Sequence, residues 1–423
     1  MPQPVPDMRN DSQAPRQFDV VIVGGGSAGI AAAASLLKRA PRLAVAIVEP
    51  RDTHDYQPGF TMVGGGIFAQ NETRRPMAAV MPRGVTWLQG AAAGFDPARN
   101  QVMMDDGRLI AYRVLVLAPG LTLDWEAIPG LVETLGKNGV TSNYRYDLAP
   151  YTWRLVQDMK GGTALFTQPP MPIKCAGAPQ KAMYLSCDAW RRRGVLKNID
   201  VTFHTAAPTL FGVAAYVPAL MDYVRAYGAE LAFQSQLVAV DGPAKTATFA
   251  NKEADGNVAT VTRGFDMLHV VPPQKAPAVI AQSPFAGAGG WADVDPETLQ
   301  VNGHANVFAL GDVISAANAK TAAAARKQAP IVAQNVLAHL AGGPLPARYD
   351  GYGSCPLTVE RGRIVLAEFG YGGKLLPTFP KAILDGQKPT RLAWMLKATL
   401  LPPIYWHAML KGREWLARCS VSA

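Results

Sequence analysis

A short glycine-rich segment near the N-terminus constrains the fold of this 423-residue chain more than any other feature. The segment, Gly24-Gly25-Gly26-Ser27-Ala28-Gly29, lies between an apolar run at 18–23 and an alanine-rich run at 30–39, and a second apolar run follows at 43–49. This order predicts a buried parallel strand, a tight turn, a helix and a second strand, which together form a βαβ unit. The chain is therefore predicted to begin with an α/β domain built on a parallel sheet.

The glycines have the spacing G-x-G-x-x-G, which is typical of a dinucleotide-binding turn when a strand precedes it and a helix follows. In such a turn Gly24 permits the tight bend, Gly26 lets the backbone approach a pyrophosphate, and Gly29 allows close packing of helix and strand. The N-terminus of the helix, which includes Ser27 and Ala28, then faces the phosphates. These five residues are the first part of the predicted cofactor site.

The end of the second strand supports the same interpretation. Glu49, followed by Pro50, closes this strand. A carboxylate at this position accepts hydrogen bonds from both ribose hydroxyls of a dinucleotide and repels a 2′-phosphate. We therefore predict a dinucleotide without that phosphate, either FAD or NAD.

A later segment favours FAD. Val307-Phe308-Ala309-Leu310-Gly311-Asp312 resembles the second FAD signature of the flavoproteins with two dinucleotide-binding domains, in which the Asp holds the ribityl chain. Ala118-Pro119-Gly120 resembles the A-T-G segment of that superfamily, with Pro in place of Thr. A helix that begins near Lys320-Thr321 directs its N-terminal amides at the flavin in this interpretation. The resemblance adds these residues to the predicted FAD site: Ala118, Pro119, Gly120, Gly311, Asp312, Lys320 and Thr321.

The second domain is predicted to lack a cradle for a nicotinamide cofactor. An apolar strand at 163–168 opens it, and a helix at 183–193 and a strand at 201–204 follow. The segment after the first strand, 168–172, contains three prolines and no G-x-G, so it makes a poor pyrophosphate site. Cys175 stands near the position where NAD(P) enters related folds, and we infer that this domain has lost NAD(P).

The order of the elements predicts an α/β fold with two Rossmann-like nucleotide-binding domains. The stretch 306–313 is predicted to be a strand that returns to the first domain, with a helix at 320–339, so the FAD domain is discontinuous. The predicted parts are a disordered N-terminus at 1–17, the FAD domain at 18–145 and 296–345, a degenerate second domain at 146–295, and a C-terminal region at 346–423.

Four cysteines are too few for a disulfide scaffold in a chain of this length, so catalytic or incidental thiols remain. Lys174 and Lys181 flank Cys175 and favour its thiolate. Cys187 lies on a predicted helix and is interpreted as a buried small apolar residue, and Cys419 as an incidental surface thiol. The six histidines have no metal-ligand spacing, and we expect no metal site.

Five segments spread over most of the chain carry a resemblance to one family. They are K-C-A-G-A-P-Q-K-A-M-Y-L (174–185), G-S-C-P-L (353–357), L-A-E-F (366–369), H-D-Y-Q-P-G (54–59) and the stretch 395–406. Together they resemble the sulfide:quinone oxidoreductases of the mitochondrial and bacterial type II branch. Type I relatives have a third active-site cysteine early in the chain, and none precedes Cys175 here, which agrees with type II.

This resemblance implies an FAD enzyme that oxidises hydrogen sulfide and reduces ubiquinone or a similar quinone. The family's redox pair falls on Cys175 and Cys355, which the resemblance implies are bridged at rest by a disulfide or a trisulfide. Hydrosulfide attack then leaves a persulfide on Cys355 and frees the Cys175 thiolate. Two electrons pass to FAD, and a low-molecular-weight sulfane acceptor restores the bridge.

The same resemblance assigns four further positions. Gln57 and Pro58 are placed near the flavin, and Lys181 and Lys397 match lysines on the quinone side of the family. There the lysines polarise the quinone or balance the charge of the reduced flavin. For Lys397 a solvated surface position is the alternative.

The C-terminal region carries most of the chain's formal charge of +9, because residues 373–423 hold eight basic and two acidic side chains. Apolar residues at helical spacing over 392–400 precede Pro402-Pro403, and Tyr405, Trp406, Met409 and Leu410 follow. We predict two short amphipathic helices joined by a break at the prolines that anchor the protein to a membrane surface. The alternative is a helical hairpin packed on its own core.

These features predict a peripheral, monotopic protein on a bacterial inner membrane. The first seventeen residues have no apolar signal region, and no stretch reaches the length of a transmembrane helix. No nucleic-acid-binding motif accompanies the basic charge, so we expect no nucleic-acid partner. A homodimer is compatible with the sequence.

Two other functions share parts of this pattern. A type II NADH:quinone dehydrogenase, or a related flavin disulfide oxidoreductase, has the same fold, but the NADH enzyme needs the second glycine turn. A flavoprotein that serves as a redox sensor or scaffold without catalysis is the other alternative.

Overall fold

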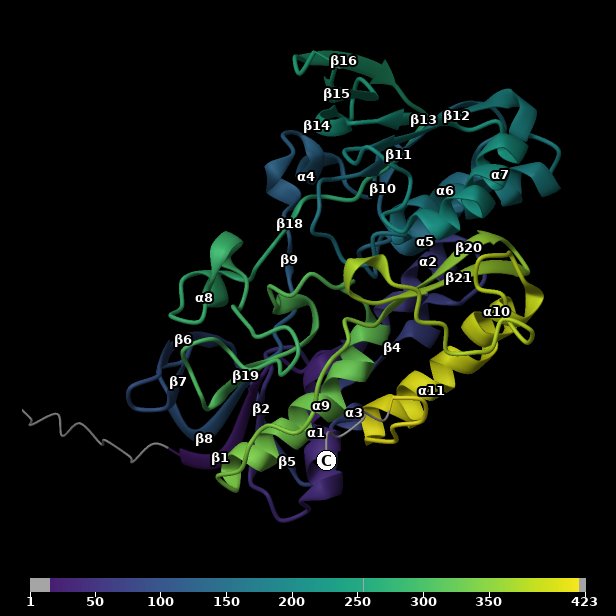
Figure 1. Ribbon diagram of the computed structural model, residues 1–423. Coiled ribbons are helices and arrows are strands. Elements are labelled where there is room, and N and C mark those ends of the chain that lie inside the picture. Colours follow the sequence, from purple (N-terminus) through teal and green to yellow (C-terminus); the bar gives the residue numbers. More distant parts are fainter. Residues whose placement is uncertain (1–15, 254, 418–423) are drawn as a thin grey trace, which may run out of the picture.

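The predicted βαβ unit forms the centre of a parallel sheet in the first domain of the computed structural model, which describes residues 16–253 and 255–417 (Figure 1). Its strands lie in the order β5-β2-β1-β8-β7-β6, and β19 pairs with β8. Strands β1, β2, β5, β8 and β19 run parallel to one another, and β7 pairs antiparallel with both β8 and β6. The elements are β1 (Arg16–Val23), α1 (Ser27–Arg39), β2 (Val45–Val48), β5 (Val85–Leu88), β6 (Ala92–Asp96), β7 (Gln101–Met104), β8 (Leu109–Leu117) and β19 (Val307–Ala309).

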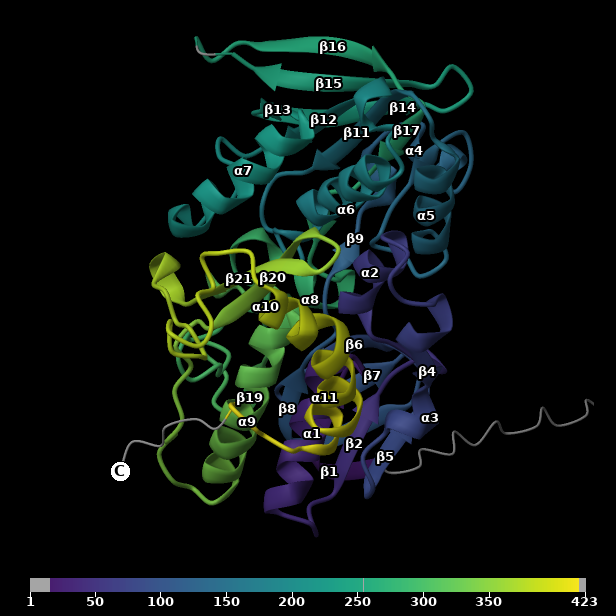
Figure 2. The same ribbon diagram turned by 90° about the vertical axis from the view of Figure 1, so that its right-hand side faces the viewer.

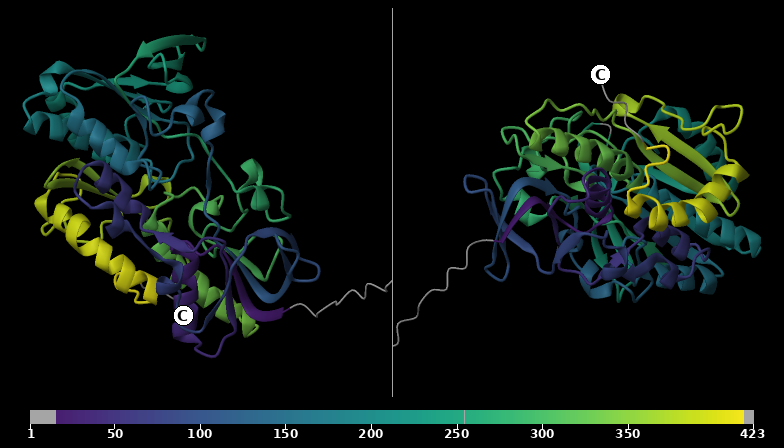
Figure 3. Two further views of the ribbon diagram at one scale, coloured as in Figure 1. Left: turned by 180° about the vertical axis from the view of Figure 1, so that it is seen from behind. Right: turned by 90° about the horizontal axis from the view of Figure 1, so that it is seen from below.

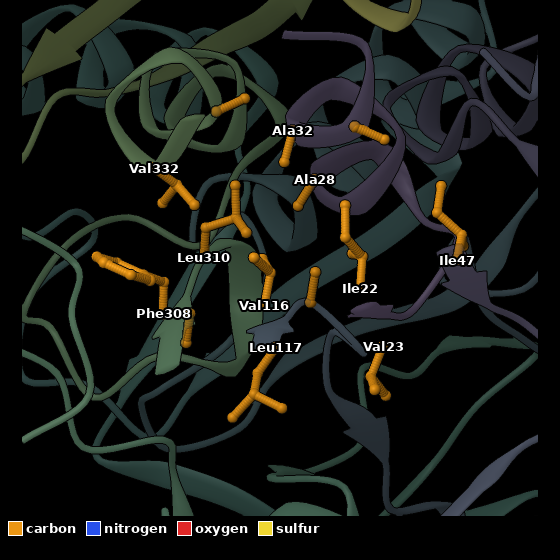
Figure 4. Packing of buried hydrophobic residues seen from close by; sticks show 14 of the residues in the cluster. Ile22, Val23, Ala28, Ala32, Ile47, Val116, Leu117, Phe308, Leu310 and Val332 are labelled. Atoms are coloured by element: carbon orange, nitrogen blue, oxygen red, sulfur yellow. The ribbon is translucent and has the colours of Figure 1, made fainter. Parts of the chain in front are cut away.

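Two helices cover this sheet and bury its apolar strands. Figure 4 shows Ile22, Val116 and Phe308 on the strands, with Ala32 of α1 and Val332 of α9 (Ala322–Leu340) nearby. The alanines of α1 keep that helix close to the sheet, because they add little volume between the two. The pairing of β19 with β8 confirms that a late segment returns to the first domain.

The second domain has its own parallel sheet, in the order β10-β17-β11-β12-β13. Helices α5, α6 and α7 pack with this sheet, and a small antiparallel sheet, β14-β15-β16, extends it. Helix α6 begins five residues before the predicted start at 183, because Pro179 fits the first turn of a helix, where no backbone N–H is needed. The elements are β10 (Val140–Thr141), α5 (Ala149–Asp158), β11 (Gly162–Gln168), α6 (Ala178–Arg192), β12 (Ile199–Thr205), α7 (Val217–Tyr227), β13 (Glu230–Phe233), β14 (Ser235–Asp241), β15 (Thr246–Lys252), β16 (Val258–Gly264) and β17 (Met267–His269).

The chain crosses between the domains earlier than the sequence pattern indicated. Strands β9 (Thr122–Leu123) and β18 (Gln274–Lys275) pair with each other at the crossing. Strand β10, before the predicted boundary at 145, belongs to the second sheet, and Ile280 and Phe285, before the boundary at 295, lie in the core of the first domain. A two-residue strand such as β10 has no recognisable apolar run, which is why the pattern misplaced the boundary.

The last two residues of the predicted disordered tail, 16 and 17, belong to a strand. Arg16 and Gln17 extend β1 and pair with Ile110 and Ala111 of β8. The rest of the predicted tail, 1–15, lies outside the residues that the structure describes.

A hairpin from the C-terminal region packs on the second domain. Strands β20 (Gly353–Glu360) and β21 (Arg363–Phe369) pair antiparallel. Leu357 and Val359 of β20 share one buried cluster with Met183 and Trp190 of α6. This packing places the β20 strand beside the start of α6, where Cys175 precedes the helix.

The C-terminal helical region is not broken at its prolines, contrary to the prediction. Helix α10 (Arg391–Met395) continues through a π-helical turn, Leu396–Leu400, into α11 (Leu401–His407), and this run lies along one side of the molecule (Figures 2 and 3). Pro402 and Pro403 lie in the first turn of α11, directly after the π-helical turn that replaces regular α-helical bonding ahead of them.

Only part of the predicted apolar face of this run is exposed. Leu392, Met395 and Leu400 are about half exposed, whereas Tyr405, Trp406, Met409 and Leu410 are buried in the first core. Among the residues described, no helix has the length and apolarity required to span a membrane. Smaller elements of the first domain are β3 (Thr53–Asp55), α2 (Phe60–Gly64), β4 (Arg74–Pro76) and α3 (Met77–Val80), and α4 (Leu131–Thr134) and α8 (Ala278–Ala281) flank the crossing.

Replacing Leu357 with Ala should lower the free energy of unfolding by about 2–5 kcal/mol, because the leucine is fully buried between β20 and α6. Urea denaturation measures this change. Val258→Ala on the exposed strand β16 is the control and should change stability by less than about 0.5 kcal/mol. An equal effect of the two substitutions would contradict the importance of this packing.

Candidate active site

The glycine turn has the geometry that its spacing predicts. Gly24 has φ of +108°, and a Cβ there would lie 2.3 Å from the carbonyl oxygen of Ala118. A Cβ on Gly29 would lie 2.0 Å from the Gly24 carbonyl oxygen, whereas a Cβ on Gly26 would meet no atom within 4 Å. Two positions therefore require glycine for packing, and the third leaves open space in front of the helix N-terminus.

Glu49 lies directly behind this turn. One carboxylate oxygen accepts a hydrogen bond from the Gly25 N–H at 2.7 Å, and the other accepts from the Arg51 N–H at 2.9 Å. Each oxygen keeps a further acceptor position. Glu49 is buried and Pro50 is exposed.

The second FAD-like signature lies beside the first one. A Cβ on Gly311, where φ is +82°, would approach Cβ of Ala28 to 2.9 Å. Thr321 caps helix α9 by accepting a hydrogen bond from the Ala324 N–H. Pro119 and Gly120 follow β8, whose last residue pairs with the last residue of β1 at the edge where the glycine turn begins. The glycine turn, the acidic residue and the second signature thus form one edge of the first sheet, and these groups fit a bound dinucleotide.

Lys320 is held by main-chain oxygens at this edge. Its ammonium donates to the carbonyls of Asp312 and Ile314 at 2.7 and 2.8 Å and lies 4.1 Å from the ring centre of Trp291. Burial lowers the pKa of Lys320 to about 8. Its carbonyl accepts from the Cys175 N–H at 2.9 Å, so the FAD-like edge and the cysteine loop are joined.

The fold brings Cys175 and Cys355 together. Cys175 lies between β11 and α6, Cys355 lies in β20, and their Sγ atoms are 3.3 Å apart. A Cβ on Gly177 would lie 2.5 Å from the Cys355 sulfur, so only glycine lets the two segments approach in this way. Cys175 has φ of +50°, a left-handed conformation that costs a non-glycine residue energy and is often found at functional sites.

Lys181 contacts both sulfurs. Its Nζ lies 3.3 Å from the Cys175 sulfur and 3.8 Å from the Cys355 sulfur, and the side chain is buried. The hydrogen bond from Cys355 and the charge of Lys181 hold the pKa of Cys175 well below its ordinary value. The contact with Cys175, together with burial, raises the pKa of Cys355. When both cysteines are reduced, the lower pKa therefore belongs to Cys175, which favours the thiolate on this sulfur.

Lys174, the other predicted partner of the thiolate, points elsewhere. Its ammonium donates to Oε1 of Gln57, and its carbonyl accepts from the hydroxyl of Tyr144 at 2.8 Å. Lys174 thus links the cysteine loop to the turn Gln57–Gly59 of the first domain. The favourable charge beside Cys175 comes from Lys181, six residues later on the first turns of α6.

Lys397 is buried and is not a solvated surface residue. Its Nζ donates to the Pro58 carbonyl at 2.9 Å and lies 5.7 Å from the ring centre of Tyr56. Burial, with repulsion from Lys181, lowers the pKa of Lys397 to about 7. The C-terminal helical run therefore contributes a titrating lysine to the neighbourhood of the sulfur pair.

Sequence reasoning missed two tyrosines at the site. Tyr144 donates to the cysteine loop, and Tyr405 of α11 contacts the glycine turn. Tyr144 belongs to no segment that the sequence singled out, and Tyr405 lies in the stretch 395–406 but received no role at the site. Only the packing of distant segments places them there. Cys187 is buried in α6, where burial raises the pKa of its thiol, and Cys419 lies outside the described residues.

Residues 18–329 match the family of pyridine nucleotide-disulphide oxidoreductases. The chain is 39% identical over 402 residues to the mitochondrial sulfide:quinone oxidoreductase of Dictyostelium discoideum, which covers 94% of this chain and 87% of that protein. It is 38% identical over 399 residues to the mitochondrial sulfide:quinone oxidoreductase of Mus musculus, with 94% and 88% covered.

Solved structures show the same fold at lower identity. The sulfide:quinone oxidoreductase of Aquifex aeolicus has a TM-score of 0.75 and 20% identity, with 94% of this chain and 92% of that chain covered. A chain in the mitochondrial ATP synthase of Tetrahymena thermophila has a TM-score of 0.82 and 21% identity, with 96% and 98% covered. At these identities the likeness establishes the fold alone.

Replacing Lys181 with Met should raise the pKa of Cys175, because the substitution removes the cation next to its thiolate. In reduced protein the midpoint for alkylation of Cys175 by iodoacetamide should move up by about one to three pH units. Mass spectrometry of the Cys175 peptide across pH measures this midpoint. Lys160→Met, on an exposed residue, should leave the midpoint in place; an unchanged midpoint in Lys181→Met would refute the role of Lys181.

Proposed function

Since the chain belongs to the pyridine nucleotide-disulphide oxidoreductases and, within them, to the sulfide:quinone oxidoreductases, we propose that it oxidises hydrogen sulfide and reduces a membrane quinone. One observation carries this proposal. Two cysteines 180 positions apart meet at 3.3 Å beside a buried lysine, and the loop that holds one of them is bonded to the FAD-like edge of the first domain.

Proteins of this family are flavoproteins, and we propose FAD as the cofactor of this chain. The first-turn N–H groups of α1 would hold its pyrophosphate, Glu49 its ribose, and Asp312 its ribityl chain. Bound FAD supplies a two-electron acceptor between the sulfur pair and the quinone. The open space before Gly26 and the closeness of Gly311 to Ala28 support this assignment.

The resting pair is proposed to hold one sulfur bridge. The sulfurs of Cys175 and Cys355 are 3.3 Å apart. Two S–S bonds of about 2.05 Å that share one bridging sulfur span roughly this distance. We therefore favour a trisulfide over a direct disulfide as the resting form. Hydrosulfide attacks the sulfur of Cys355 and the bond between that sulfur and the bridging sulfur breaks. Cys355 then carries a persulfide, and the bridging sulfur stays on Cys175 with the electron pair as a persulfide anion. Lys181 stabilises this leaving group because its ammonium lies 3.3 Å away.

The sulfur cycle closes with a low-molecular-weight acceptor. A nucleophile such as a thiolate or sulfite takes the sulfane sulfur from Cys355, and the freed Cys355 thiolate forms the bridge again with the sulfur on Cys175. Bound FAD would take up the two electrons that this oxidation releases. Ubiquinone or a similar quinone finally accepts the electrons. Lys397, with a pKa of about 7, is proposed to supply or release a proton on the acceptor side.

The rival NADH:quinone dehydrogenase needs a pyrophosphate cradle in the second domain. Here the loop between β11 and α6 contains Pro169, Pro170 and Pro172 and then Cys175. Proline lacks the N–H that a phosphate requires. The position of a second glycine turn is thus occupied by the cysteine loop, which supports sulfide over NADH as the reductant.

Replacing either Cys175 or Cys355 with Ser should abolish sulfide-dependent quinone reduction, because neither variant can form the sulfur bridge. Absorbance of the flavin and of the quinone measures this loss. Cys187→Ala, which removes a buried thiol of α6 that takes no part in the proposed bridge, is the matched control and should keep the activity. Reduction of quinone by NADH but not by sulfide in the unaltered protein would overturn the proposal.

We also propose that the protein is peripheral on a bacterial inner membrane, through the outer face of the α10–α11 run. Leu392, Met395 and Leu400 on this face are 44%, 57% and 50% exposed. Exposed basic residues, Lys388 and Arg391, lie at its start and suit anionic headgroups. The buried face of the same run carries Lys397, so quinone from the lipid would meet the acceptor side directly.

Replacing Leu392, Met395 and Leu400 together with Ser should weaken binding to liposomes by about 100-fold, because the exposed half of each side chain contributes about 1 kcal/mol. Co-sedimentation with liposomes measures the binding. A double change of the exposed Val258 and Val261 on β16 to Ser serves as the control and should leave it unchanged. Equal binding of the triple variant and the unaltered protein would exclude this face as the anchor.

A further inference from the structure

The hydroxyl of Tyr405, in α11, contacts the glycine turn 378 residues earlier in the chain. It lies 2.6 Å from the Ser27 Oγ and 2.6 Å from the His54 Nε2. The other ring nitrogen of His54, Nδ1, lies 3.1 Å from the Gly25 carbonyl oxygen. Tyr405 and His54 are each about 3% exposed, so water does not compete for these bonds.

The direction of each hydrogen bond that joins Ser27, Tyr405, His54 and Gly25 follows from the groups involved. A carbonyl oxygen only accepts, so the Nδ1 of His54 carries the proton and donates to Gly25. Burial lowers the pKa of His54 to about 4, so its ring is neutral near pH 7 and the Nε2 is an acceptor. The Tyr405 O–H therefore donates to His54, and the Ser27 O–H donates to the Tyr405 oxygen.

These donor and acceptor roles determine which groups of the glycine turn can bind a phosphate. The proton of the Ser27 hydroxyl is committed to Tyr405 and is not available to a phosphate. The Gly25 N–H is bonded to Glu49 and the Gly25 carbonyl to His54, so the peptide groups on both sides of Gly25 are held. The first N–H groups of α1 have no partner within the helix and remain the donors for an anion.

Aromatic packing holds Tyr405 in place. Its ring centre lies 4.7 Å from that of Tyr56 and 5.0 Å from that of Trp406, and the guanidinium of Arg75 lies 4.5 Å from the ring centre of Trp406. The same helical run carries Lys397 on its earlier turns. Figure 2 shows this run in front of the first domain, next to α1.

We propose that Tyr405 is a positioning residue that ties the C-terminal helical run to the glycine turn and so sets the affinity of the turn for FAD. In this proposal it acts through Ser27 and His54, whose polar atoms its hydroxyl contacts, and not by binding the cofactor directly. This inference rests on the proposed FAD site. The inference adds that the C-terminal helical run, which carries Lys397 of the proposed acceptor side, helps to retain FAD.

The test is the affinity of the apoprotein for FAD in Tyr405→Phe, measured by the quenching of FAD fluorescence. The variant leaves His54 Nε2 and the Ser27 hydroxyl without their buried partner, so we expect affinity to fall by about tenfold or more. Tyr227→Phe, which removes one buried hydrogen bond to Val359, is the matched control and should keep its FAD affinity. The thermal midpoints of the two apoproteins should fall by similar amounts, because each loses one buried hydroxyl.

A double-mutant cycle with Ser27→Ala separates positioning from a direct contact with phosphate. The loss of FAD affinity caused by Ser27→Ala is measured in the unaltered protein and again in Tyr405→Phe. If Ser27 acts through Tyr405, the fold-loss in Tyr405→Phe should be at least about threefold smaller than the fold-loss in the unaltered protein. If Tyr405→Phe does not fold, the same cycle is measured with His54→Phe in its place, because that change removes the acceptor of the Tyr405 hydroxyl and leaves Ser27 unchanged.

Each outcome has one meaning. Additive effects in the cycle, or normal FAD affinity in a folded Tyr405→Phe or Ser27→Ala, would overturn the positioning role while the FAD site stands. Failure of the unaltered apoprotein to bind FAD would instead overturn the proposed function, and this inference with it.

Discussion

The packing of the β20–β21 hairpin against α6 is the constraint on which the rest of the site depends. It joins a C-terminal strand to a loop of the second domain and holds the two cysteine sulfurs at 3.3 Å. The absence of a side chain at Gly177 permits this approach, because any Cβ would meet the Cys355 sulfur. Without this contact the two thiols would belong to separate parts of the chain, and neither sulfur would lie within reach of the other.

The site buries positively charged lysines beside the two cysteine sulfurs. Lys181 keeps its proton because the sulfurs attract it, although burial opposes this, and the pKa of Lys181 is raised as a result. Lys397, farther from the sulfurs and repelled by Lys181, has a pKa near 7. Two lysines in one buried region therefore differ in protonation behaviour, which fits the proposed roles of Lys181 beside a thiolate and of Lys397 in proton exchange.

The C-terminal helical run joins three parts of the molecule. Its outer face exposes apolar side chains, its earlier inner turn brings Lys397 to Pro58, and its later inner turn brings Tyr405 to the glycine turn. The π-helical turn in the middle keeps the run helical ahead of Pro402 and Pro403. A single segment thus connects the proposed membrane face with the acceptor side and the cofactor side.

The sequence by itself determined the α/β class, the glycine turn with Glu49 and the returning strand, and it singled out the two cysteines that the fold brings together, because each depends on short spacing or on a local motif. Only the tertiary structure decided that Lys181 rather than Lys174 faces the sulfurs, that Lys397 and Tyr405 are buried, and where the chain crosses between domains. These outcomes depend on contacts between residues hundreds of positions apart, and no local pattern in a chain records which distant side chains will share a buried space.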